Sequence, residues 1–140
     1  MKLRNILNEI DINIKNNLYH ATNFQNFQNI LKSGYIIQSA YRELKYQIKN
    51  KKSGFRSISL TRNLDFAKKW DDVIFVIDKN MLSTNFKIYP FSAFQQKSKI
   101  TKNEFEEFVI KPIPMKMVKK ILLPKTYKSE IFTNIPIEYY

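Results

Sequence analysis

The five residues Val73–Ile77, VIFVI, are all apolar and are flanked by acidic residues on both sides. The run is too short for a buried helix and is rich in β-branched and aromatic side chains, so it predicts a strand that is buried on both faces. Such a strand needs partner strands for its backbone groups and a covering layer on each face. The chain must therefore build a sheet around this segment.

The other periodic segments predict helices early in the chain and strands later. Apolar spacing predicts helices over 3–14, over 22–33 with a stop at Gly34, and over 62–70 with Asn63 as cap. Thr22 and Gln25 fit the S/T-x-x-Q capping pattern of the second helix. Residues 38–54 begin with a helix-like pattern and end in a lysine-rich turn. We expect strands at 17–21, 55–60, 72–78, 86–91, 104–110 and 118–124, a polar loop at 92–103 and an extended tail at 130–140.

That order of elements predicts an α+β fold, with helices packed on an antiparallel sheet. At 140 residues, of which 44% are hydrophobic and 14% aromatic, we expect a single globular domain over 1–140. No apolar run reaches the roughly 18 residues of a membrane span, and the first residues lack the apolar centre of a signal peptide. We therefore expect a soluble, cytoplasmic protein without a membrane partner.

The charge and the rare residue types exclude several kinds of chemistry. The formal net charge of +12 favours acidic partners such as nucleic acid or nucleotides, although a lysine-rich composition alone also produces it. The chain has no cysteine and one histidine, which removes thiol nucleophiles and leaves too few ligands for a zinc site. Gly34 and Gly54 are the only glycines, so neither a Walker phosphate loop nor a G-x-G-x-x-G dinucleotide motif is present. We expect no metal site.

Two groups of residues remain as candidates for function. The first surrounds His20, which either packs or caps at a strand-to-helix junction or contacts a ligand. The second is formed by Glu104, Glu106 and Glu107, of which alternation along a strand puts the first two on one face and the third on the other. These acids either meet nearby lysines at a strand end or hold a ligand group, because a buried carboxylate needs a partner.

The sequence resembles the ADP-ribosyltransferase superfamily in three segments that occur in the same order. LYHATNFQNFQNILKSGYI (18–36) resembles the first motif, in which a strand ending in an aromatic residue and histidine leads into a helix. FRSISLTRNLDFAKKW (55–70) resembles the second motif, a serine-bearing strand followed by a helix that walls the nicotinamide pocket. NEFEEFVI (103–110) resembles the third motif, the glutamate-bearing strand. The resemblance covers roughly residues 17–123 and implies an ADP-ribosyltransferase-like domain with a split antiparallel sheet.

The resemblance implies NAD as a substrate and gives roles to individual residues. His20, after Tyr19, would hydrogen-bond the adenosine-side ribose, the backbone of Ala21 would meet the nicotinamide amide, and Thr22 would support that turn. Ser57 and Ser59 would brace the pocket and help orient the glutamate. Three aromatic residues would pack on the rings of NAD, namely Tyr35, Phe66 and Trp70.

The essential acid can be matched in two ways. It is Glu107 if EEFVI is aligned with the form in which aliphatic residues follow the acid directly, which we favour. It is Glu106 if EFE is read as an E-x-E motif, with Glu104 then activating the acceptor. A glutamate suits this reaction because breaking the nicotinamide–ribose bond leaves an oxocarbenium-like centre that a fixed negative charge stabilises.

The sequence departs from the family at positions that bear on its substrate. Ala21 stands where polymerase-type members have glycine, Ser59 where they have a stacking tyrosine, and His20 where the toxin type has arginine. The resemblance therefore implies a mono-ADP-ribosyltransferase without assigning its acceptor, which is a protein or a nucleic acid. Small phage-encoded members offer a looser likeness, which would place the protein in the host cytoplasm. The rival hypotheses are an RNA 2′-phosphotransferase of related fold and a non-catalytic binding protein that captures a nucleotide or host factor.

Overall fold

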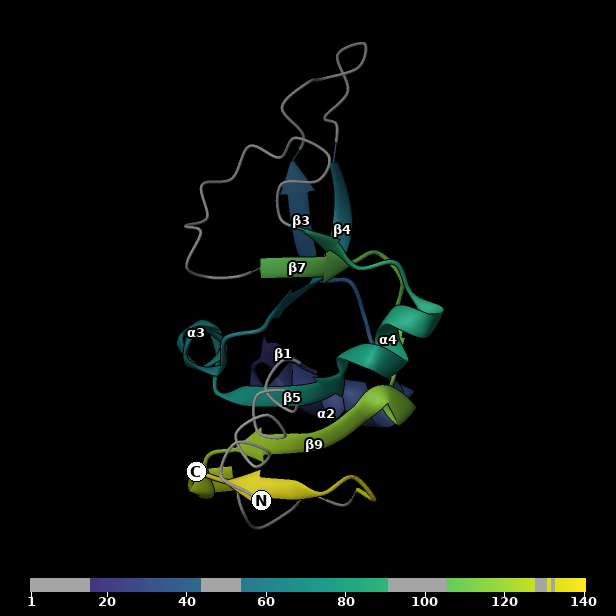
Figure 1. Ribbon diagram of the computed structural model, residues 1–140. Helices are drawn as coiled ribbons and strands as arrows, with labels where there is room; N and C mark the ends of the chain where they lie inside the picture. Colours follow the sequence, from purple (N-terminus) through teal and green to yellow (C-terminus); the bar gives the residue numbers. More distant parts are fainter. Residues whose placement is uncertain (1–15, 44–53, 91–105, 128–130, 132) are drawn as a thin grey trace, which may run out of the picture.

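The computed structural model describes residues 16–43, 54–90, 106–127, 131 and 133–140, which build a sheet flanked by helices (Figure 1). The helix expected over 3–14, the loop expected at 92–103 and the candidate acid Glu104 lie outside this part of the chain. Within the described residues, no helix is long and apolar enough to cross a membrane.

Eight strands of the described chain form one mixed but mainly antiparallel sheet, in the order β10-β9-β5-β1-β4-β7-β6, with β3 also paired to β4. Their bounds are β1 (Asn17–Thr22), β3 (Ala40–Glu43), β4 (Gly54–Thr61), β5 (Val73–Asp78), β6 (Tyr89–Pro90), β7 (Glu106–Val109), β9 (Val118–Leu123) and β10 (Ile137–Tyr139). A separate antiparallel pair joins β2 (Tyr35–Ile36) to β8 (Ile113–Pro114). Together with the helices, this sheet confirms the expected α+β class.

The sheet opens between β1 and β4. These two described strands pair at a single position, where Tyr19 lies opposite Thr61, whereas β1 and β5 pair along their whole length. Figure 1 shows the consequence: β3 and β4 run across the direction of β5 and β9. The sheet therefore has two halves, and the ends of β1 and β4 diverge where the first and second motifs meet.

Three α-helices and two short 3-10 turns complete the described chain, and their bounds are α2 (Phe24–Ser33), α3 (Leu64–Trp70), α4 (Lys79–Asn85), η3 (Met115–Met117) and η4 (Lys125–Tyr127). Helix α2 ends at Gly34, as expected, because φ is +80° there and glycine adopts this left-handed conformation without strain. The cap expected at Thr22 is wrong. The side chain of Asn23 caps the helix by accepting from the backbone of Asn26 at 2.8 Å, since Thr22 still belongs to β1 and pairs with Val73.

The central strand β5 is buried on both faces, as its apolar run predicts. One face belongs to the main core, where Phe75 and Ile77 pack with Leu18 and with Phe27 of α2. The other face belongs to a smaller cluster, in which Ala67 of α3 packs with residues of the sheet, namely Tyr19, Ile74, Val76 and Leu122. Neighbouring residues of β1 therefore enter opposite layers.

Three local predictions differ from the structure. The helix-like pattern at the start of 38–54 is wrong for 40–43, which form β3 because Ala40 and its neighbours pair with β4. Helix α4 was not expected. It begins at Lys79, and Asp78 caps it by accepting a hydrogen bond from the backbone of Met81. It buries only Leu82, so it carries no apolar period. Of the strand expected at 86–91, the described residues form β6 at Tyr89–Pro90 only, and residue 91 lies outside the described part of the chain. The tail does dock, because β10 pairs in parallel with β9.

Candidate functional site

His20 lies in the middle of β1, at the opening between the two halves of the sheet. Its side chain is buried, and its ring stacks on Phe75 of the paired strand with 6.4 Å between ring centres. Its Nδ1 lies 2.9 Å from the backbone oxygen of Ser59 on β4. This bond crosses the place where the backbone ladder between β1 and β4 stops, so the imidazole replaces a strand-to-strand contact.

The partner of His20 determines its tautomer. A carbonyl oxygen only accepts, so Nδ1 must carry the proton and donate it to Ser59. Burial lowers the pKa of His20 below its ordinary value, and the hydrogen bond to the Ser59 carbonyl opposes this shift only in part. The ring is therefore neutral near pH 7, and Nε2 keeps a lone pair that can accept a hydrogen bond, for example from a sugar hydroxyl.

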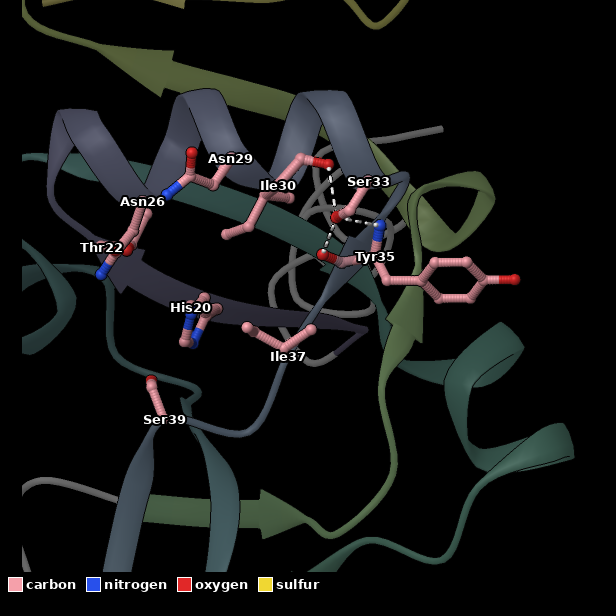
Figure 2. Close-up of a pocket in the computed structure, with 9 residues that line it drawn as sticks. All are labelled: His20, Thr22, Asn26, Asn29, Ile30, Ser33, Tyr35, Ile37 and Ser39. Carbon is pink, nitrogen blue, oxygen red and sulfur yellow. Dashed lines mark hydrogen bonds between the residues drawn. The ribbon is translucent and has the colours of Figure 1, made fainter.

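His20 borders a cavity of about 190 Å³ between β1, α2 and the segment that follows α2 (Figure 2). Thr22 lies beside His20 in the wall, and the exposed Tyr35 forms part of the rim. None of the described residues that line the cavity is lysine or arginine, and its surface is mainly apolar. Such a cavity suits an uncharged ring or sugar better than a phosphate.

Helix α2 supplies lining residues that the sequence analysis did not single out. Asn26, Asn29, Ile30 and Ser33 point toward the cavity, with Ile37 and Ser39 completing the wall. The helix positions are three or four residues apart, so they share one face. That spacing is visible in the sequence, but it does not show that this face of the helix borders a cavity.

Glu106 is connected to His20 through Ser59. The Ser59 hydroxyl donates to Glu106 Oε1 at 3.1 Å, while the carbonyl of the same serine accepts from His20. Glu106 is buried, with 7% of its surface exposed, and it lies opposite Thr61 in the β4–β7 pair. One residue of β4 therefore contacts both the histidine of the first motif and a glutamate of the third.

Glu107 points to the other face of β7 and has a different partner. It lies opposite Leu60, and its Oε1 is 2.5 Å from Nε of Arg62, just beyond the end of β4. The Arg62 side chain is 44% exposed and the Glu107 side chain 16% exposed, so the pair is only partly exposed. Alternation along β7 thus separates the two described glutamates as expected.

Ser59, Glu106 and Glu107 do not line the cavity beside His20, and neither do the remaining predicted site residues that the structure describes. Ser57 is buried, and its hydroxyl donates to the Ala40 carbonyl at 3.3 Å. Ala21 and Tyr19 belong to the small cluster on the opposite face of β1. Two half-buried aromatic residues of α3 do not line the cavity beside His20: Phe66 and Trp70.

The described part of the chain contains no cluster of three or more His, Asp or Glu side chains that could hold a metal ion. Comparison of the sequence with protein-family models and with curated proteins found no match. The function of the protein must therefore be inferred from the three motifs and from the geometry of these residues.

Proposed function

We propose that this protein is an NAD-dependent mono-ADP-ribosyltransferase that modifies a protein or nucleic-acid acceptor. The observation that carries the proposal is the contact of Ser59 with both His20 and Glu106. The resemblance assigns these two side chains to opposite ends of one NAD molecule. It also assigns to the serine strand the task of orienting the glutamate, and the Ser59 hydroxyl is in position to do so.

In this proposal the cavity beside His20 takes the adenosine end of NAD. Its volume of about 190 Å³ is below the roughly 300–1,000 Å³ typical of a whole ligand site, so it would hold only part of a dinucleotide. Nε2 of the neutral imidazole accepts a hydrogen bond from a ribose hydroxyl, and Thr22 and Asn26 offer further polar contacts. The rest of NAD then extends past Ser59 toward Glu106.

Glu106 is the acid we propose for the reaction, in preference to Glu107. The bond between C1′ of the ribose and the nicotinamide nitrogen breaks, and its electron pair leaves with nicotinamide, which becomes neutral. The carboxylate stabilises the positive charge that develops on the ribose. The acceptor nucleophile then forms a bond to C1′ and releases its proton to solvent. Glu107 is less suited because it points to the other face of β7, away from the Ser59 hydroxyl, where it forms an ion pair with Arg62.

The test is transfer of label from NAD carrying radioactive adenylate, incubated with a cell lysate. We expect transfer by the wild type and its loss in Glu106→Gln. Glu107→Gln is the matched control, since it makes the same change one residue further along β7 and should retain transfer. Loss of transfer in Glu107→Gln alone would make Glu107 the acid instead of Glu106. If the wild type neither transfers label nor cleaves NAD, the proposal that the protein is an enzyme is contradicted.

The same experiment separates the rival functions. A binding protein would capture a nucleotide or partner without turnover. A 2′-phosphotransferase would hold a phosphate with cations, and none of the described lining residues of the His20 cavity supplies one. That composition favours the transferase over the phosphotransferase.

A further inference from the structure

A second surface of the protein lies further along the strand that carries Glu106. Residues of α4, β6 and the end of β7 surround a cavity of about 180 Å³, lined by Asn85, Phe86, Lys87, Tyr89, Ile110 and Lys111. We propose that this cavity binds single-stranded nucleic acid and presents it as the acceptor. Its role as an acceptor site rests on the proposed function, whereas the binding itself does not.

The register of the sheet places this cavity near Glu106. Phe108 lies opposite Ser59 on one side and opposite Tyr89 on the other, so it shares the face of Glu106, two residues away. Two residues of strand rise and one interstrand step together separate the backbones of Tyr89 and Glu106 by about 8 Å. A chain bound at Tyr89 can therefore reach the reacting ribose.

Aromatic side chains form a row across this face. The ring centres of Phe55 and Phe108 are 5.7 Å apart, and those of Phe108 and Tyr89 are 5.4 Å apart. Tyr89 is half-buried, and Lys87 Nζ lies over its ring, 5.2 Å from the ring centre. A ring beside a cation is the arrangement that stacks a base and contacts its phosphate in proteins that bind single strands.

The charge of the cavity favours an anionic ligand. Lys87 and Lys111 are both exposed, and no aspartate or glutamate is among the described residues that line it. The cavity that residues of β1, α3, β9 and β10 line differs, because its Lys120 forms a 2.7 Å ion pair with Glu138. The overall charge of +12 would draw a polyanion toward the surface. Aromatic rings beside the lysines favour nucleic acid over an acidic peptide, which needs no stacking partner.

The proposal is tested by fluorescence anisotropy with labelled single-stranded DNA and RNA oligonucleotides, titrated at salt concentrations from 50 to 200 mM. The test variant is Lys87→Gln with Lys111→Gln. The control is Lys116→Gln with Lys125→Gln, which removes two exposed lysines that do not line the cavity and leaves the same net charge. A single-strand phosphate contact contributes about 0.7 to the slope of log K against log salt, so the test pair should lower the slope by about 1.4. The control pair should leave it nearly unchanged.

Tyr89→Leu should weaken binding about tenfold with an unchanged salt slope, since it removes stacking rather than charge. Circular dichroism melts check that each variant is folded. If Tyr89→Leu does not fold, the variant with Lys87→Gln and Lys111→Gln still tests the proposal, because both lysines are exposed. Equal losses in test and control pairs, no oligonucleotide binding, or equal competition by polyglutamate would each overturn the proposal. Lysine-dependent binding without transfer from NAD would support the surface and contradict the enzyme. Transfer to lysate protein without oligonucleotide binding would support the enzyme and contradict nucleic-acid binding at this surface.

Discussion

The two faces of strand β7 hold the same side chain in opposite surroundings. Glu106 is buried and accepts from the Ser59 hydroxyl, whereas Glu107 is ion-paired with the exposed Arg62. Successive residues of a strand point to opposite faces, so a shift of one residue in the chain exchanges a carboxylate that accepts from a serine for one that is paired with an arginine. The comparison teaches that the order of the acidic residues in the sequence does not show which carboxylate contacts Ser59, whereas the register with the partner strand does.

The largest difference between the two acids should appear in turnover. Glu106→Gln removes the negative charge from the site of the developing cation, so we expect the rate of transfer from NAD to fall by about two to three orders of magnitude. Glu107→Gln should stay within a few-fold of the wild type. Steady-state rates of nicotinamide release measure both, and equal losses would show that the two faces do not differ in function.

Ser59 can be used to weaken the Glu106 face without changing the acid. Ser59→Ala removes a hydrogen bond to a charged group, worth about 1.5 kcal/mol or more, and should lower the rate about tenfold. His20 keeps its bond, because it contacts the backbone oxygen. Ser57→Ala is the matched control, since that hydroxyl bonds Ala40 instead. A similar rate loss in both variants would mean that the serines act only through stability.

The His20 end of the site should respond to pH. The folded protein has a lowered His20 pKa, so below about pH 6.5 the unfolded chain binds more protons, and the free energy of unfolding falls as the pH falls. One such group contributes at most about 1.4 kcal/mol per pH unit. Burial raises the pKa of Asp71, which acts in the opposite direction at lower pH, so the range 7.5–5.5 isolates the histidine. Denaturant melts of the wild type and His20→Gln should show the dependence only in the wild type.

The smallest effect is expected at the Glu107 face. Arg62→Gln breaks a partly exposed ion pair, so the free energy of unfolding should change by about 0–1 kcal/mol, and less at high salt. Urea titrations at two ionic strengths measure this change. A loss of several kcal/mol would show that the pair supports the sheet and would narrow the contrast with Glu106.

Local signals in the sequence predicted much of the fold. The apolar run of β5, the glycine stop of α2 and the Asn63 cap of α3 were each readable, because they depend on a few neighbouring residues. Strand β3 could not be predicted from neighbouring residues, since it pairs with residues of β4 that are more than ten positions away. Helix α4 was missed because one buried leucine makes no period.

The candidate site was readable in part for the same reason. The strand-to-helix junction that follows His20 and the alternation of Glu106 and Glu107 depend on neighbouring residues, and the structure confirms these two local features. The connection through Ser59 joins three strands, and only the register of those strands decides that it meets Glu106 rather than Glu107. The contribution of Asn26 and Asn29 follows from the position of α2 over the cavity, which the sequence does not give.

The most direct test of the central claim is a crystal structure of the Glu106→Gln protein with NAD bound. We predict the adenosine-side ribose within hydrogen-bonding distance of His20 Nε2, and the nicotinamide-side ribose against position 106, past Ser59. NAD bound elsewhere, or no NAD binding by calorimetry at millimolar concentration, would contradict the account.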